Sequence, residues 1–191
     1  NEMTTVRIFS GNKTFFVEGV GYEPVGQILE KDESTQAKLT PELIQTLRTG
    51  FLCNNAGIDI EKERYVAKGS HTEVALIVSA KKAGVDEKLL KIDEIPFESK
   101  QQYMATLHEG GEENIIYVKG SPERILKFCK NQLIDGKKLS LDKEFIMQNV
   151  EDMAKNALRV LAMAYKKVPK DKLSLDEKDI SDLTFVGAQG M

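Results

Sequence analysis

The sequence predicts an α+β fold: a single domain in which a twisted antiparallel sheet of about six strands is flanked by helices. Short segments rich in β-branched and aromatic residues are joined across Gly11-Asn12 and Gly110-Gly111, as in antiparallel hairpins. Helical segments with start signals lie before and between these strands. The length of 191 residues fits one domain of roughly 150 residues with an elaboration, and we find no repeat, heptad pattern or low-complexity tract.

The predicted strands follow the alternation of apolar and polar residues and the runs of apolar residues. We expect them at residues 4–10, 13–17, 92–97, 102–109, 114–118, 158–165 and 183–187. The segment 158–165 is apolar enough for a central strand buried on both faces. A polar surface loop is expected at 31–37, a turn through Asp135-Gly136, and a charged loop at 166–182.

Four helices are predicted from their capping signals and helical spacing. Thr40-Pro41-Glu42 supplies an N-cap, a proline at the first position and an acid in the first turn. Ser70 is followed three residues later by Glu73, which is the pattern of a capping box. Ser121-Pro122 begins a helix that we expect to reach about residue 130, and an amphipathic helix is expected over residues 142–157.

Composition and charge exclude several classes of protein. The chain has 27 Lys+Arg against 30 Asp+Glu and a net charge of −3, with both signs interspersed, which argues against a nucleic-acid partner. The longest apolar run, Val160 to Tyr165, is far shorter than the ~20 residues that cross a bilayer. Residues 1–10 lack the basic and apolar pattern of a secretory signal. We therefore expect a cytosolic domain without direct membrane contact.

The remaining local patterns favour structural interpretations. Cys53 and Cys129 stand among apolar neighbours and are expected to be buried reduced thiols. With two histidines and no CxxC or HExxH pattern, the sequence offers almost no material for a structural zinc site, and no metal-binding residue is expected. The glycine-rich stretch 19–26 contains Pro24 and a misplaced third glycine, so we interpret it as a turn-forming loop and not as a phosphate loop.

Seven longer motifs occur in a fixed order. They are Asn1 to Thr4 (NEMT), Gly21 to Gly26 (GYEPVG), Gly69 to Leu76 (GSHTEVAL), Pro96 to Met104 (PFESKQQYM), Lys119 to Glu123 (KGSPE), Ala157 to Ala162 (ALRVLA) and Leu183 to Met191 (LTFVGAQGM). Together they resemble the nucleotide-binding domain of P-type cation-transporting ATPases, most closely the calcium-pump and sodium-pump branch. The resemblance covers nearly the whole chain.

The resemblance implies a role for the chain within a larger pump. In this family the phosphorylated aspartate lies in an Asp-Lys-Thr-Gly-Thr segment shortly before the Asn-Glu-Met stretch, so no catalytic residue is expected within these residues. Residues 1–191 are then a nucleotide-binding domain, with 1–4 and 187–191 as junctions to a phosphorylation domain. The expected partners are ATP and the phosphorylation and actuator domains of an integral membrane protein, on its cytoplasmic side. Mg²⁺ would accompany ATP and be held mainly by the phosphorylation domain.

A binding site for adenine needs an aromatic ring whose face stacks on the base, an apolar wall and a few polar groups. Phe97 is the expected face, because the polar loop that follows it would leave its ring open; from the residues alone it also fits a core phenylalanine. Lys119 ends an apolar strand and fits either a ligand contact or a solvent-facing lysine. Gly120 would permit close backbone approach to a ligand. Ser121 is expected to make a backbone-level contact besides its capping role.

The resemblance implies the remaining contacts. Glu73 is similar to the family's glutamate that accepts a hydrogen bond from the adenine amino group, although it also fits the capping box. Arg159 is similar to the arginine that reaches ribose or phosphates, which suits a guanidinium. Met104 and Leu161 complete the expected site. Gln102 stands where the family often has lysine, which removes a positive charge, and His71 replaces the more usual proline or alanine.

These patterns predict a domain that binds ATP and presents its γ-phosphate to an aspartate of a neighbouring domain, in a pump that transports cations, with calcium favoured. Such catalysis is positional. The alternative is an interaction module of the same fold that has lost nucleotide binding; in that case Phe97, Lys119 and Arg159 would not converge. A self-contained kinase or hydrolase is disfavoured, because the sequence has no GxxxxGK[ST] or GxSxG motif.

Overall fold

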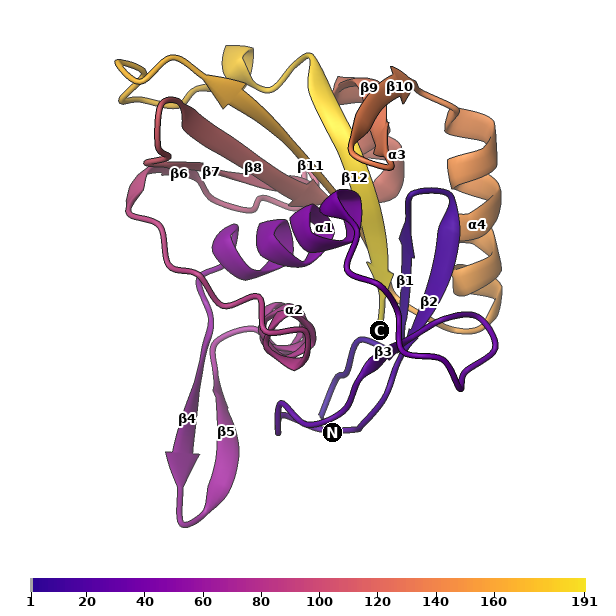
Figure 1. Ribbon diagram of the computed structural model, residues 1–191. Helices are drawn as coiled ribbons and strands as arrows, with labels where there is room; N and C mark the ends of the chain where they lie inside the picture. The colour runs from indigo at the N-terminus through magenta and orange to yellow at the C-terminus, as the bar shows by residue number, and fades with distance from the viewer. Residues whose placement is uncertain (1) are drawn as a thin grey trace.

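The computed structural model describes residues 2–191 and is built around one large twisted sheet with helices on both faces (Figure 1). Its main path runs β3-β2-β1-β12-β11-β8-β7-β6, and β9 and β10 extend it to ten strands. The strands are β1 (Arg7–Ser10), β2 (Lys13–Val17), β3 (Ile28–Leu29), β6 (Lys91–Ile95), β7 (Tyr103–His108), β8 (Asn114–Gly120), β9 (Cys129–Ile134), β10 (Lys137–Ser140), β11 (Val160–Val168) and β12 (Leu183–Gly190). The predicted α+β class is confirmed.

The sheet is larger than the six or so strands that the sequence predicts. The two-residue strand β3 and the polar strands β9 and β10 lack a clear apolar alternation, so pattern alone does not reveal them. Strand β9 also pairs with β12 in parallel, whereas the other pairs in this sheet are antiparallel. The predicted hairpin across Gly11-Asn12 and the meander of β6, β7 and β8 are both present.

The two ends of the described chain adjoin neighbouring strands, β1 and β12. Strand β12 extends to Gly190, three residues beyond its predicted end, and pairs with β1 so that Arg7 faces Gly190. The backbone N–H of Val6 donates to the Gly190 carbonyl at 2.8 Å. In Figure 1 the N and C labels accordingly lie close together, at the end of the molecule near β3.

Within residues 2–191, four α-helices cover the sheet: α1 (Pro41–Leu52), α2 (His71–Lys82), α3 (Pro122–Phe128) and α4 (Lys143–Lys155). The predicted caps of α1 and α3 are present, because Thr40 Oγ1 accepts from the Leu43 N–H at 3.3 Å and Ser121 Oγ from the Arg124 N–H at 3.4 Å. A short 3₁₀ turn, η1 (Glu177–Asp179), lies in the charged loop.

The helices divide into two pairs, one for each face of the sheet. Along β7, β8 and β11, alternate residues such as Ala105, Val118 and Ala162 pack with α3 and α4. Their neighbours Met104, Tyr117 and Met163 pack with α1 and α2. This alternation is the two-residue period of a strand buried on both sides. Each fully buried large aliphatic side chain contributes about 1.5–3 kcal/mol through the apolar area removed from water.

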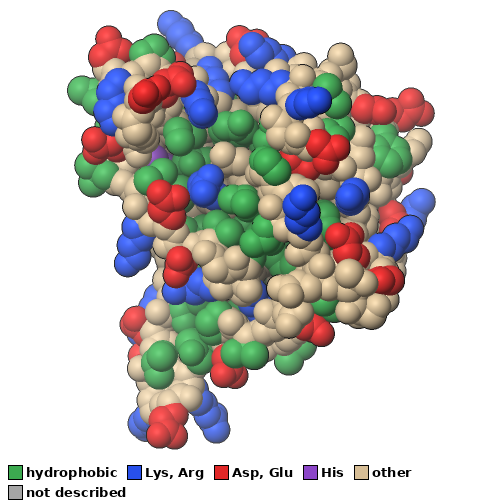
Figure 2. Space-filling view, in the orientation of Figure 1, with side chains coloured by type: hydrophobic (Ala, Val, Ile, Leu, Met, Phe, Trp, Pro, Cys, Tyr) green, Lys and Arg blue, Asp and Glu red, His purple; other side chains and the backbone are tan. Residues whose placement is uncertain are grey.

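A second, two-stranded sheet is absent from the sequence prediction. Strands β4 (Gly57–Glu61) and β5 (Arg64–Lys68) form a hairpin with Lys62 and Glu63 at its turn, both at positive φ. Figure 2 shows this hairpin projecting from the body with charged side chains at its tip. Since most of its residues are exposed or half-exposed, its sequence lacks the apolar signal of a packed strand. No helix within residues 2–191 is long and apolar enough to cross a membrane.

Candidate functional site

A cavity of about 390 Å³ opens beside the start of α2, at the ends of β6, β8 and β11. Its size is in the range of small-molecule sites. It is lined by Asn55, Ser70, Thr72, Glu73, Pro96, Phe97, Met104, Lys119, Gly120, Arg159 and Leu161. Pairing of β7 with β8 and of β8 with β11 brings together segments that are far apart in the sequence.

Most of the predicted site residues line this cavity. They are Glu73, Phe97, Met104, Lys119, Gly120, Arg159 and Leu161. Gln102 and Ser121 do not line it. Four further lining residues, Asn55, Ser70, Thr72 and Pro96, were not predicted as site residues. Ser70, Thr72 and Pro96 adjoin predicted site residues in their motifs, whereas Asn55 lies in a loop to which the sequence assigns no motif.

Phe97 follows the edge strand β6 and is 53% exposed. The interpretation of this residue as a core phenylalanine is therefore wrong. Its ring borders the cavity from the segment that begins at Pro96. An exposed phenylalanine on one wall, with the apolar side chains of Met104 and Leu161 also lining the cavity, is an arrangement that can take a flat aromatic ligand.

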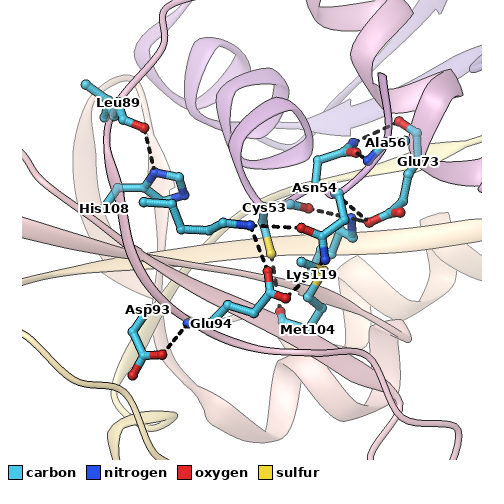
Figure 3. Close-up of polar contacts among 12 residues, drawn as sticks. Cys53, Asn54, Ala56, Glu73, Leu89, Asp93, Glu94, Met104, His108 and Lys119 are labelled. Carbon is cyan, nitrogen blue, oxygen red and sulfur yellow. Dashed lines mark hydrogen bonds and ion pairs between the residues drawn. The ribbon is translucent and has the colours of Figure 1, made fainter. Parts of the chain in front are cut away.

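Lys119 lies inside the protein, with only 6% of its side chain exposed. It shares a strand face with Tyr117, and this face is the one covered by α1 and α2. Its ammonium group donates to Glu73 Oε1 at 2.7 Å and to the backbone carbonyl of Cys53 (Figure 3). Lys119 is therefore not the solvent-facing lysine that its place at a strand end also allowed.

Glu73 stands in the first turn of α2, but it does not form the predicted capping box. The Ser70 side chain makes no capping hydrogen bond. The Glu73 carboxylate instead accepts from Lys119 and, at 3.2 Å, from the backbone N–H of Asn55. A buried ammonium group needs a counter-charge, and this requirement outweighs the local cap. The pair places one negative and one positive group side by side in the cavity wall.

Cys53 forms the layer behind this ion pair. Its thiol is fully buried and donates to the Met104 carbonyl at 3.4 Å (Figure 3). Burial raises the pKa of the Cys53 thiol, although nearby Lys119 opposes the shift. Both cysteines are free, as predicted, but Cys129 is only partly buried. The thiol of Cys53 is thus an uncharged packing group beneath the cavity.

Arg159 immediately precedes β11. Its backbone is held in a reciprocal pair with Met191: the Arg159 N–H donates to the Met191 carbonyl at 2.8 Å, and the Met191 N–H donates back at 3.0 Å. Among residues 2–191 no carboxylate lies within ion-pair distance of its guanidinium. The exposed guanidinium is therefore available to an anionic group of a ligand.

Gly120 lines the cavity at a point where β7 and β8 approach closely. A Cβ atom at this position would stand 2.3 Å from the Gln102 carbonyl oxygen and 2.8 Å from Tyr103 Cα. The Ser121 N–H donates to the same carbonyl at 3.0 Å, and Gln102 adopts a φ of +60°. The neighbouring strand thus already requires glycine at 120, and Gln102 and Ser121 are engaged with each other beside the cavity.

Comparison with known proteins agrees with this architecture. The family model described as "P-type ATPase, cytoplasmic domain N" matches residues 42–191. The chain is 42% identical over 203 residues to the "Cation-transporting ATPase pma1" of Synechocystis sp., with 100% of this chain and 22% of the relative covered. It is 30% identical to the "Calcium-transporting ATPase" of Bacillus subtilis, covering 100% of this chain and 22% of the relative. It is also 30% identical to the "Calcium-transporting ATPase type 2C member 1" of Bos taurus, covering 100% and 20%.

The fold is thus an α+β sheet that brings an aromatic ring, a buried ion pair and an exposed guanidinium to the wall of one cavity. The family match and the relatives specify it further: the chain belongs to the N-domain family of P-type cation-transporting ATPases. It spans about a fifth of the length of these curated relatives.

Proposed function

We propose that this domain binds the adenosine end of ATP in the 390 Å³ cavity. The observation that carries the proposal is the convergence of Phe97, the Glu73–Lys119 pair and Arg159 on that one cavity. Adenine stacks on the exposed ring of Phe97, with Met104 and Leu161 as the apolar wall. Stacking of a base on an aromatic side chain contributes roughly 1–3 kcal/mol.

The polar groups of the cavity orient the nucleotide. Glu73 accepts a hydrogen bond from the adenine amino group, and its ion pair with Lys119 holds the carboxylate in place. Arg159 donates to ribose or phosphate oxygens, for which its unpaired guanidinium is suited. Gly120 supplies backbone at the cavity wall. Gln102 and Ser121 lie beside the cavity, and their contact with ATP is through the backbone of Gly120, which they hold in place.

Mg²⁺ accompanies ATP as its counter-ion. Glu73 is the one carboxylate among the lining residues, and it is already paired with Lys119. A Mg²⁺ ion prefers several oxygen ligands in octahedral geometry. We therefore assign Mg²⁺ mainly to the phosphates of ATP and to the phosphorylation domain of the parent protein.

The whole protein, on this proposal, is an ATP-driven cation pump, with calcium favoured as the transported ion because the relatives from Bacillus subtilis and Bos taurus carry calcium transport in their names. Residues 1–191 are its nucleotide-binding domain on the cytoplasmic side of the membrane. Residues 1–4 and 187–191 join it to the phosphorylation domain, a role supported by the pairing of β1 with β12. The actuator domain is the second partner. Catalysis depends on alignment of the γ-phosphate with an aspartate of the phosphorylation domain.

The alternative, an interaction module without nucleotide binding, predicts that Phe97, Lys119 and Arg159 lie apart. All three line the same cavity, which favours nucleotide binding.

An amide NMR titration with ATP, AMP and GTP tests the proposal. We expect shifts concentrated around Glu73, Phe97, Lys119 and Arg159, with AMP nearly as effective as ATP. GTP should bind more weakly, because guanine carries a carbonyl oxygen at C6, where adenine carries the amino group that donates to Glu73. Absence of any shift at millimolar ATP, or equal shifts spread over the whole surface, would overturn it.

A further inference from the structure

Three polar side chains form a closed ring at the rim of the cavity. Lys91 Nζ donates to Asn55 Oδ1 at 2.8 Å and contacts Glu94 Oε2 at 2.8 Å. Asn55 Nδ2 completes the ring by donating to Glu94 Oε1 at 3.2 Å. Glu94 is labelled in Figure 3, next to Asp93.

The ring connects two parts of the cavity wall that no backbone hydrogen bond joins. Asn55 belongs to the loop between α1 and β4, lines the cavity, and donates its backbone N–H to Glu73. Glu94 lies in β6, three residues before Phe97. Lys91 and Glu94 do not line the cavity themselves. They contact it only through Asn55 and through the strand that leads to Phe97.

Both connected parts are weakly held by regular structure. Strand β6 is the last strand of the sheet, and its pairing with β7 shifts in register between Lys91 and Asp93. Residues 54–56 belong to no helix or strand. An edge strand with a bulge and an irregular loop owe their relative position to side-chain contacts.

We propose that Asn55, Lys91 and Glu94 act as a clamp that fixes the loop against β6 and thereby sets the distance between the Glu73 and Phe97 sides of the cavity. Lys91 and Glu94 are then positioning residues for nucleotide binding. This inference rests on the proposed binding of ATP. The hydrogen bond from Lys91 is also the largest effect that lowers the pKa of Glu94, so the carboxylate is charged at neutral pH.

A simpler electrostatic explanation makes a different prediction. If Lys91 and Glu94 acted on ATP only through their charges, then removal of Lys91 would weaken binding of the anionic nucleotide and removal of Glu94 would strengthen it. The clamp requires both side chains, so loss of either one weakens binding. The sign of the Glu94 effect therefore separates the two explanations.

The test measures the Kd of ATP and of uncharged adenosine by calorimetry for the wild type, Lys91→Met and Glu94→Met. We expect each variant to raise the Kd of ATP and the Kd of adenosine by about threefold, which is the scale of the free energy contributed by a partly exposed ion pair. The swapped variant Lys91→Glu/Glu94→Lys should recover most of the affinity, because the Asn55 amide can rotate to reverse its donor and acceptor. Lys170→Met, which removes the ion pair with Glu109 at 3.3 Å, is the matched control and should bind like the wild type.

Each outcome decides between the two proposals. Unchanged affinity in both methionine variants, or tighter ATP binding by Glu94→Met, overturns the clamp while leaving nucleotide binding intact. No binding of ATP or adenosine by the wild type overturns the proposed function and the clamp together. Thermal melting of every variant identifies any that has lost its fold, and the swapped variant then carries the test.

Discussion

Lys119 Nζ lies 2.7 Å from Glu73 Oε1, and this contact joins a central strand to the first turn of α2. Only 6% of the Lys119 side chain and 18% of the Glu73 side chain are exposed. The Cys53 carbonyl accepts a second hydrogen bond from the same ammonium group. The end of α1, the start of α2 and the strand β8 therefore meet at a single lysine, and this lysine also lines the candidate nucleotide site.

The ion pair predicts an asymmetric response to substitution. Glu73→Leu leaves a buried ammonium group with only a carbonyl partner, so we expect the free energy of unfolding to fall by about 1–3 kcal/mol. The double variant Glu73→Leu/Lys119→Met removes both charges and should recover part of that loss. Urea denaturation of the single and double variants measures the coupling. Strictly additive losses would show that the two side chains do not stabilise each other in solution.

Substitution of Phe97 should change the affinity for ATP without changing the stability of the fold. Because its ring is 53% exposed, Phe97→Ala should change the free energy of unfolding by no more than about 0.5 kcal/mol. The same change should weaken ATP binding by roughly tenfold through loss of stacking. Phe145→Ala is the matched control. Phe145 lies in α4, on the face of the sheet away from the cavity; it is 37% exposed, and its ring packs against that of Phe9. Equal ATP affinity in the two variants would remove Phe97 from the site.

Elements with a strong local signal were predictable from the sequence. Thr40-Pro41 and Ser121-Pro122 specify helix starts by their own hydrogen bonds and fixed backbone angles, and both caps are observed. The seven cavity residues recovered from the sequence all belong to motifs that carry the family resemblance. Residues alone left Phe97 and Lys119 ambiguous, because exposure and pairing depend on neighbours distant in the chain.

The remaining features depend on tertiary contacts without a sequence signature. Asn55 hydrogen-bonds with side chains 36 and 39 residues away, and the hairpin β4–β5 buries too little apolar surface to show a pattern. The capping box at Ser70 fits the local pattern but is absent, since Lys119 from a strand 46 residues later takes the Glu73 carboxylate. The capping pattern does not predict the structure here, because pairing the buried ammonium group of Lys119 stabilises the protein more than the local cap does.

Glu42 is a further case in which local and tertiary roles differ. The sequence identifies it as an acid in the first turn of α1, but it is 2% exposed and binds another turn. Its Oε1 accepts from the Asp135 N–H and its Oε2 from the Gly136 N–H, both at 3.1 Å. In Glu42→Gln the amide NH₂ faces one of these donors, so we expect a loss of about 1–3 kcal/mol in the free energy of unfolding. Glu87→Gln, at an exposed ion pair, is the control for urea denaturation and should lose far less; a similar loss in both variants would contradict the role of Glu42.

His108 predicts how stability depends on pH near neutrality. The imidazole is 3% exposed, its Nδ1 lies 3.1 Å from the Leu89 carbonyl, and its ring stands edge-on to Tyr117 with 5.6 Å between the ring centres. Within residues 2–191 its Nε2 has no hydrogen-bond partner. Burial disfavours the charged imidazolium, so the pKa of His108 in the folded protein is lowered from its ordinary value of 6.5.

The direction of the resulting pH effect follows from the two pKa values of His108. Between the lowered folded value and the unfolded value of about 6.5, the unfolded chain binds a proton that the folded chain does not. The free energy of unfolding should therefore be highest above pH 7 and fall as the pH drops below about 6.5, by at most about 1.4 kcal/mol per pH unit. Urea denaturation at pH 7.5, 6.5 and 5.5 measures this slope. His108→Gln should flatten it, whereas His71→Gln, which removes the other histidine, should retain it; a slope that survives in His108→Gln would place its origin in another group.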